Sequence, residues 1–519
     1  MPEGEPQPAF LPRRRRWLTV GLVVAVVAAG AGLRFYAIGR KSLWLDEAAT
    51  MSAVDASFAQ VFRGVKAHDA HPPLYYLALH TWMQGSRSAA WARSFSAAVG
   101  VATLAVFYFL ARALLPRGAA LVATLLLAAS AYQVYFAQEA RHYALAAFFV
   151  VAAWYCLAHL VAGTWRHRWP LWLGLALANT AGLYTFYYTA FSVAAQGVVL
   201  VLLWRRAGRR LMLDWALWQL VPAAVFGLWV EVILERIGRL SQFEPPAGHT
   251  VLSATGLCET AAQFASGFLA ELMRNDGPAV RAAAAAVGLL VLALALLGLR
   301  RERCATVVAF AWLLGPVAFL AVLPMRGHAY EPKHLIFASP ALALAAGVAW
   351  SSARGGLRAV TIALLGALLA GNGVSLAQYY RPAVEKENWR GAVEQFAERA
   401  HAGDIVTFTP PYVELAYRYY QARHGVPRVW LVATPPAGEP FRGGELRYAR
   451  RDGRRVWVFQ GVSRVEMPNP RVFDALGGYP RVFEWSHEGL VGTVSVSLYD
   501  AFQPPAPRGA QGASRRESR

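Results

Sequence analysis

Two adjacent carboxylates follow the first long apolar stretch of the chain. They stand in the run Ser42-Leu43-Trp44-Leu45-Asp46-Glu47-Ala48. Acidic side chains beside a membrane are costly unless they are hydrated, paired or used in chemistry. One use is a general base that removes a proton from an attacking acceptor hydroxyl. The alternative is a solvated first helical turn, where Asp and Glu are favoured.

A second polar cluster lies further along the same loop, in residues 68–76. Its sequence, HDAHPPLYY, places two histidines and Asp69 before a Pro-Pro pair and an aromatic group. Asp69 and His71 with His68 could hold a divalent cation, although the set is short and lacks visible outer support. A turn with aromatic residues at the membrane interface is the alternative.

Basic groups mark two later positions. Glu139 and Arg141 lie in Tyr135–Tyr143 at the end of an apolar run, and Lys333-His334 close the polar loop that begins at Arg326. The planar donor fork of Arg141 suits a phosphate group. An ion pair that anchors helix ends, and a snorkelling lysine, are the alternatives at the two positions.

The composition is that of a membrane protein. Of the 519 residues, 56% are hydrophobic, 13% aromatic and 16% charged, which is too apolar for an ordinary soluble domain. The formal charge of +20 comes mainly from basic residues between apolar runs, so membrane topology explains it and no nucleic-acid partner is expected. Cys156, Cys258 and Cys304 are far apart in the sequence and predict neither disulfides nor a metal cluster.

Runs of about 20 apolar residues predict eleven membrane-spanning helices. The expected spans are residues 17–37, 91–114, 118–136, 142–163, 170–186, 188–204, 214–234, 279–299, 304–323, 334–352 and 357–376. Arg13–Arg16 before the first run resembles the start of a signal peptide, but the many later spans favour an uncleaved helix.

The basic residues also predict an orientation. Arginines gather in alternate short loops, such as Arg13–Arg16, Arg205–Arg210 and Arg300–Arg303. Short cytoplasmic loops are enriched in Lys and Arg, so the N-terminus is expected in the cytoplasm and the C-terminus outside. The predicted location is the inner (plasma) membrane.

The predicted domains follow from these spans. We expect a basic cytoplasmic N-terminus (1–16), a transmembrane domain (17–379) with a first outer loop at 38–90, an extracytoplasmic α/β domain (380–503) and a disordered tail (504–519). Strand-like runs at 404–409, 428–432, 455–461 and 492–499 alternate with helix-like stretches at 390–401 and 412–423.

The polar clusters all fall on the outer side of the predicted membrane. A carboxylate base, cationic groups and aromatic platforms beside a lipid phase describe a site for a lipid-linked phosphosugar. The sequence has no Walker-type loop and no compelling Rossmann fingerprint, which disfavours a nucleotide-sugar donor. No cofactor is predicted with certainty; a divalent cation is left open.

At these residues the chain resembles the GT-C superfamily of membrane glycosyltransferases, specifically family 39, which includes protein O-mannosyltransferases and aminoarabinose transferases. The resemblance is carried by 44–47 (WLDE), 71–76 (HPPLYY), Arg93, 139–143 (EARHY), 331–335 (EPKHL) with Pro340, and 386–390 (KENWR). It implies inverting transfer from a polyprenyl-phosphate sugar to a glycan, lipid or protein acceptor. Relatives often have an Arg-Tyr or Arg-His pair in place of Lys333-His334, and a His in place of Phe186.

The resemblance also implies roles for single residues. Asp46 is expected to be the base with Glu47 beside it. The donor phosphate would be bound by Arg141, Lys333, His334 and Arg93, and the acceptor or substrate by His71, Glu139, Trp44, Tyr143 and Asp69. Two other functions are open: a carrier that moves lipid-linked sugars across the bilayer, and a non-catalytic subunit of cell-envelope assembly that keeps the fold.

Overall fold

The computed structural model divides the chain into two compact units. It describes residues 13–69, 71–240, 254–267, 277–322, 331–435, 444–463, 468–477, 479–490 and 492–500. The first unit comprises Met1–Ile38 and Ser57–Tyr379, and the second comprises Gly39–Ala56 and Tyr380–Arg519. The short segment Gly39–Ala56 thus joins the C-terminal part of the chain. The predicted tail at 504–519 and most of the predicted N-terminal segment lie outside the described residues.

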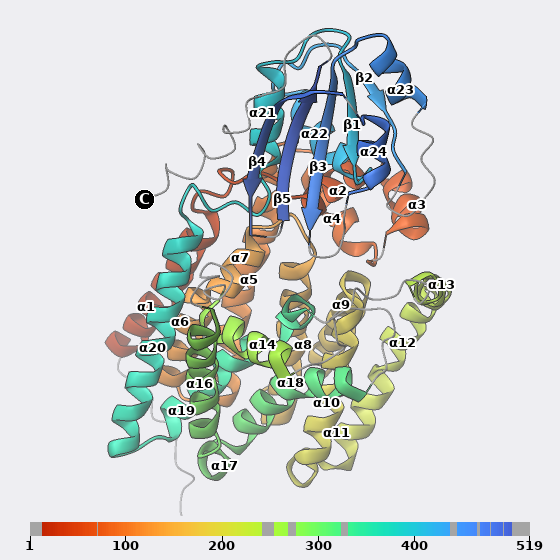
Figure 1. The fold of residues 1–519 in the computed structure, drawn as a ribbon. Helices are drawn as coiled ribbons and strands as arrows, with labels where there is room; N and C mark the ends of the chain where they lie inside the picture. Colours follow the sequence, from red (N-terminus) through yellow and green to blue (C-terminus); the bar gives the residue numbers. More distant parts are fainter. Residues whose placement is uncertain are drawn as a thin grey trace, which may run out of the picture. The chain divides into compact units, whose positions relative to one another are not determined.

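The first unit is helical (Figure 1). Its elements are α1 (Arg13–Phe35), α3 (Phe58–His68), α4 (Leu74–Trp82), α5 (Ala89–Leu114), α6 (Arg117–Ala129), α7 (Ala131–Ala137), α8 (Tyr143–Ala162), α9 (Trp169–Thr185), η1 (Tyr187–Thr189), α10 (Ala190–Leu202), α11 (Trp204–Trp218), α12 (Leu220–Gly227), α13 (Val230–Leu240), α14 (Ala254–Ser266), α16 (Gly277–Ala295), α17 (Gly298–Arg301), α18 (Arg303–Val322), η2 (Pro332–Ala338), α19 (Pro340–Ser352) and α20 (Gly356–Tyr379).

Several of these helices are long and apolar enough to cross a membrane. Among the described residues there are 6 such helices, or up to 9 if each bent helix pair is one span. The bent pairs correspond to three of the expected spans: α6 and α7 meet at 54°, the α11–α12 stretch meets α13 at 61°, and η2 meets α19 at 49°. The protein is therefore a multi-pass membrane protein, while the total of eleven spans stays a prediction.

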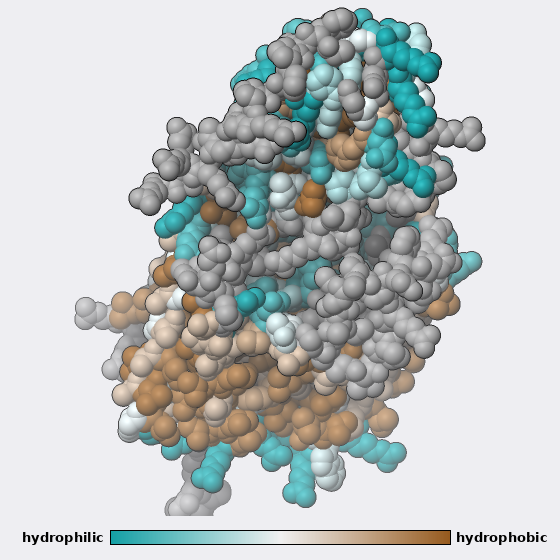
Figure 2. All heavy atoms as spheres, in the orientation of Figure 1, coloured by the Kyte–Doolittle hydropathy of each residue, from teal (hydrophilic) through white to brown (hydrophobic). Residues whose placement is uncertain are grey.

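The surface of this unit has the polarity that a bilayer requires. Figure 2 shows a band of hydrophobic side chains over the helices, with hydrophilic residues below it. Exposed apolar side chains of this unit include Leu289, Leu290, Val360 and Ile362. Such a surface would be unfavourable in water and is stable against lipid chains.

The break between α6 and α7 is held by a helix far away in sequence. Helix α6 ends at Ala129, and after Ser130 the Ala131 amide, the first of α7, donates to Oδ1 of Asn372 on α20 at 2.8 Å. The Asn372 amide donates to the carbonyls of Ala265 at 2.7 Å and Leu368 at 2.8 Å. Because lipid offers no hydrogen bonds, a broken helix needs such a partner.

Asn372→Ala is expected to destabilise the first unit by about 1–3 kcal/mol, because it leaves buried backbone groups without partners. The measurement is the thermal unfolding midpoint in detergent. Thr361→Ala on the same helix is the control, since the buried Thr361 hydroxyl donates to the Leu357 carbonyl of its own helix. Equal midpoints for the two variants would contradict the role of Asn372.

The second unit contains a mixed sheet with the strand order β2-β1-β3-β5-β4. Its strands are β1 (Ile405–Thr409), β2 (Trp430–Val432), β3 (Val456–Ser463), β4 (Arg481–Glu488) and β5 (Gly492–Tyr499), and its helices are α2 (Leu45–Val54), α21 (Trp389–Ala397), α22 (Val413–Gln421), α23 (Gly444–Arg451) and α24 (Pro470–Ala475). Strand β1 pairs in parallel with β2 and β3, whereas β5 runs antiparallel to β3 and β4.

The predicted α/β character of this part is confirmed. The four expected strands correspond to β1, β2, β3 and β5, and the two expected helices to α21 and α22. Strand β4 was not predicted, because it is an edge strand whose residues are mostly exposed or half-buried. Strand β1, by contrast, is buried along its whole length and shows the continuous apolar pattern of a central strand.

Candidate functional site

The two adjacent carboxylates lie in the first turn of α2, within the second unit. Asp46 is half-buried, whereas Glu47 is only 1% exposed. The helix begins after Trp44, whose extended backbone suits an N-cap but whose side chain makes no capping hydrogen bond. Asp46 is thus the more accessible carboxylate of the pair, as a general base must be.

The missing cap of α2 is supplied by Glu387, from the segment that leads into α21. Its Oε2 accepts a hydrogen bond from the Leu45 amide at 2.8 Å and another from Nε1 of Trp389 at 2.7 Å. Glu387 is 6% exposed. A carboxylate is favoured at this helix end because the unpaired amides carry partial positive charge. Glu387 belongs to the motif at 386–390, but the sequence predicted no role for it.

Burial raises the pKa of Glu387, and the nearby charge of Asp46 raises this pKa further. Hydrogen bonds from Trp389 and Leu45 and the charge of Lys386 lower the pKa, but the net shift is upward. Because the pKa of Glu387 is raised in the folded state, this side chain stabilises the fold fully when the pH is below the ordinary pKa of a glutamate. Its contribution to the free energy of unfolding is lost as the pH rises through the folded-state pKa.

Glu387→Gln keeps an acceptor oxygen without the charge. We therefore expect the variant to gain stability relative to the wild type as pH rises above the ordinary range of a glutamate. Thermal unfolding of both proteins across a pH series measures this difference. A difference that does not change with pH would contradict the raised pKa.

Most of the other predicted residues lie in the first unit, around the turn between α7 and α8. Glu139 is 1% exposed and Arg141 is 8% exposed. The Arg141 carbonyl accepts from Ser96 Oγ at 3.4 Å. Arg93 on α5 is also buried and donates to the Ile38 carbonyl at 3.1 Å. Both guanidinium groups are therefore embedded in the helical unit, and their phosphate roles stay predictions.

A row of rings connects segments that are distant in sequence. Successive centroid distances are 4.1 Å from His71 to His142, 4.6 Å from His142 to Phe186, 5.1 Å from Phe186 to Tyr188 and 4.9 Å from Tyr188 to His334. The last pair is stacked, with planes 5° apart. The predicted residues His71 and His334 therefore belong to one cluster, and Phe186 occupies its centre.

His142 was not predicted as a site residue, although it stands beside Arg141. Its ring is 4.3 Å from that of Tyr143, it is 1% exposed, and neither ring nitrogen has a hydrogen-bond partner in the described part of the chain. It interacts electrostatically with His71, Arg141, His334 and Lys333. A buried polar group of this kind calls for an explanation, and its position beside Arg141 was the available sequence signal.

The ends of the row are held by local contacts. The His71 amide donates to Oδ1 of Asp69 at 2.8 Å, which fixes the turn before α4. At the other end, Lys333 forms a 2.8 Å ion pair with Glu331, and the Glu331 amide donates to Nδ1 of His334 at 3.3 Å. An accepting Nδ1 leaves the proton of a neutral His334 on Nε2. The Lys333 pair is partly exposed and therefore easily exchanged for another anion.

The described residues contain no cluster of side chains that could form a metal centre. No three His, Cys, Asp or Glu side chains lie together there as possible ligands. The possible cation site predicted at His68, Asp69 and His71 includes the His68 side chain, which lies outside the described residues, so this site stays a prediction.

Comparison with known proteins gives a structural match only. No protein-family model and no curated protein sequence matches the chain. The crystal structure of ArnT from Cupriavidus metallidurans in the apo state matches with a TM-score of 0.54 over 92% of this chain and 98% of that chain, at 14% identity. The chain has the GT-C fold.

Other solved structures support the same fold. ArnT bound to undecaprenyl phosphate matches with the same TM-score of 0.54 and 14% identity, over 92% of this chain and 98% of that chain. The Archaeoglobus fulgidus oligosaccharyltransferase in the apo form matches with a TM-score of 0.50 over 96% of this chain and 76% of that chain, at 13% identity. The predicted GT-C architecture is therefore confirmed, with the small sheet domain at its C-terminus.

Proposed function

We propose that this protein transfers a glycosyl group from a polyprenyl-phosphate-linked sugar to an acceptor on the extracytoplasmic face of the inner membrane, with inversion. The observation that carries the proposal is the cluster around His142. In this GT-C helical unit the buried His142 ring interacts electrostatically with Arg141, Lys333 and His334. Its two nitrogens have no hydrogen-bond partner in the described part of the chain. Cationic groups in a membrane protein suit a lipid phosphate.

The proposed reaction is a single displacement. Asp46 accepts the proton of the acceptor hydroxyl while the oxygen attacks the anomeric carbon, and the polyprenyl phosphate leaves from the opposite side. A single displacement inverts the configuration at that carbon. The charge that grows on the leaving phosphate is stabilised by cations already in place, which is the most effective form of electrostatic catalysis.

The remaining residues take supporting roles in this proposal. The donor phosphate is bound by Arg141, Lys333, His334 and Arg93. His142 hydrogen-bonds to the bound donor, which supplies the partner that its ring lacks in the described part of the chain. The acceptor is contacted by His71, Glu139, Trp44, Tyr143 and Asp69, and Glu47 lies beside the base.

The structural neighbours support the choice of donor. ArnT has been crystallised with undecaprenyl phosphate, and by analogy we place a polyprenyl-phosphate carrier in this chain. Membership of family 39, a cytoplasmic N-terminus and an extracytoplasmic C-terminal domain complete the proposal. The acceptor is a glycan, a lipid or a protein of the cell envelope.

The test is sugar transfer by the purified full chain in proteoliposomes. A panel of radiolabelled polyprenyl-phosphate sugars is offered with envelope lipids, glycans and proteins as acceptors. Appearance of label in an acceptor, together with released polyprenyl phosphate, supports the proposal. Movement of the intact donor across the bilayer without transfer would replace it with a carrier function, and neither event would favour a non-catalytic subunit.

A further inference from the structure

The chain segment before α2 is held almost entirely by residues of the C-terminal part of the second unit. The Ser42 amide donates to Oε2 of Glu385 at 2.9 Å, and the Leu43 amide donates to the Tyr420 hydroxyl at 2.7 Å. Both amides belong to an irregular stretch outside the helices and strands. Long-range acceptors therefore determine the path by which the chain enters α2.

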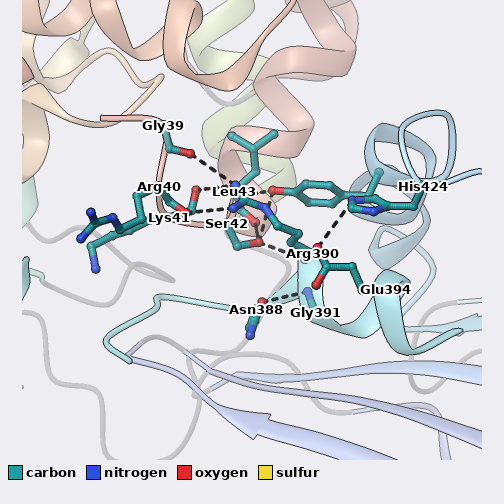
Figure 3. A network of polar contacts seen from close by, with 11 residues as sticks. Gly39, Arg40, Lys41, Ser42, Leu43, Asn388, Arg390, Gly391, Glu394 and His424 are labelled. Carbon is teal, nitrogen blue, oxygen red and sulfur yellow. Dashed lines mark hydrogen bonds and ion pairs between the residues drawn. The ribbon is translucent and has the colours of Figure 1, made fainter. Parts of the chain in front are cut away.

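Arg390 also hydrogen-bonds to the segment before α2, at residues 39–42. Its guanidinium donates to the carbonyls of Arg40 at 2.9 Å, Lys41 at 3.3 Å and Gly39 at 3.4 Å, and its own amide donates to Ser42 Oγ at 3.1 Å. Figure 3 shows the Arg390 side chain directed at residues 39–42. The rigid planar fork of arginine is well suited to hold several carbonyls at once.

Glu387 completes this arrangement at the helix itself. It accepts the amide of Leu45, the first residue of α2, at 2.8 Å. The residue before the helix is Trp44, which cannot cap it and instead lies with its ring 5.1 Å from the Lys386 ammonium group. Asp46 follows directly after the capped amide. An uncapped helix end frays within its first turn, so the carboxylate of Asp46 depends on this cap.

The segment that carries Glu387 is itself tightly placed. The Leu490 amide, in the turn between β4 and β5, donates to the Glu385 carbonyl at 2.8 Å. A side chain at Gly489 would collide with the carbonyl of Lys386, so only glycine permits this approach. The position of Glu387 is thereby tied to the sheet.

We propose that Glu387 is a positioning residue for the transfer reaction, which holds the first turn of α2 and with it the Asp46 carboxylate. The C-terminal domain is then part of the catalytic machinery, in addition to any part it has in acceptor choice. This inference rests on the proposed function, in which Asp46 is the base.

The chain offers a matched control in the next residue. Asn388 Oδ1 accepts the Gly391 amide at 2.9 Å and so caps α21, whereas Glu387 caps α2. Both are N-terminal caps in one segment, but only one of the two helices carries Asp46. The variants to compare are Glu387→Ala, Glu387→Gln and Asn388→Ala.

Full-length proteins are reconstituted in proteoliposomes and assayed for transfer from the polyprenyl-phosphate sugar that the wild type uses. We expect Glu387→Ala to lower kcat by roughly 100-fold with little change in donor KM, since a displacement of about 1 Å at the reacting group can cost that much. Glu387→Gln keeps the acceptor oxygen and should restore kcat to within about threefold of wild type. Asn388→Ala should leave kcat unchanged.

A second measurement is hydrogen exchange at the Leu45 amide, which is expected to quicken in Glu387→Ala and to stay protected in Asn388→Ala. If the two alanine variants have the same kcat while the wild type transfers sugar, the positioning role is overturned and the proposed function stands. Unchanged protection of Leu45 in Glu387→Ala would overturn it as well. If the wild type transfers no sugar, the proposed function fails and the positioning role fails with it.

Discussion

Asp46→Asn is expected to lower kcat for sugar transfer by about 10²–10⁴-fold, the usual contribution of a general base. The amide has almost the shape of the carboxylate but cannot accept the proton of the acceptor hydroxyl. Because the donor phosphate is assigned to other residues, the affinity for the polyprenyl-phosphate sugar should change little. Single-turnover transfer and equilibrium donor binding, measured on the same preparation, separate the two effects.

The matched control is Asp55→Asn, at the opposite end of the same helix. It removes an equal charge from α2 without touching the first turn, so transfer should continue at the wild-type rate. Full activity of Asp46→Asn would remove Asp46 from the base position. An equal loss in both variants would show that the helix needs its charges for folding, and the Asp46 assignment would also fall.

Arg141→Lys and Arg141→Ala are expected to weaken binding of the donor, by roughly tenfold or more for alanine, since a hydrogen bond to a charged group contributes about 1.5–3 kcal/mol. Lysine keeps the charge but lacks the two-pronged donor geometry, so its effect should be intermediate. Donor affinity is measured with a labelled polyprenyl-phosphate sugar, alongside the unfolding midpoint, because Arg141 is buried.

Arg112→Ala serves as the control for loss of a cation in the same unit. Arg112 lies in the last turn of α5 and donates to the Leu115 carbonyl, in a local contact at the end of a helix. Its loss should leave donor affinity unchanged. Unchanged affinity in Arg141→Ala, with a normal unfolding midpoint, would contradict the phosphate role of Arg141.

Local sequence patterns predicted the long helices well. The apolar runs near 91–114 and 357–376 became α5 and α20, because a backbone in lipid must satisfy its own hydrogen bonds and a helix does so within one segment. The same local preferences favour Asp46 and Glu47 in a first helical turn. These preferences depend on neighbours a few residues away, whereas the cap of that turn comes from Glu387.

The breaks in the helices could not be predicted in this way. The α6–α7 break depends on Asn372, which is 241 residues from the amide that it accepts. Likewise, the apolar run at 334–352 contains a bend between η2 and α19. A hydropathy pattern shows how apolar a run is. It does not show whether a distant side chain can hydrogen-bond to the backbone groups at a break in a helix.

The sequence alone therefore determined the membrane class, the helical and α/β parts and the residue types that could bind a phosphate or accept a proton, since these follow from composition and short-range periodicity. Only the tertiary structure decided that His71, His142 and His334 share one row of rings and that Glu387 caps the helix of Asp46 across 342 residues. Such contacts arise from the packing of whole elements. No local preference specifies them, because their free energy is gained only when the distant segments meet.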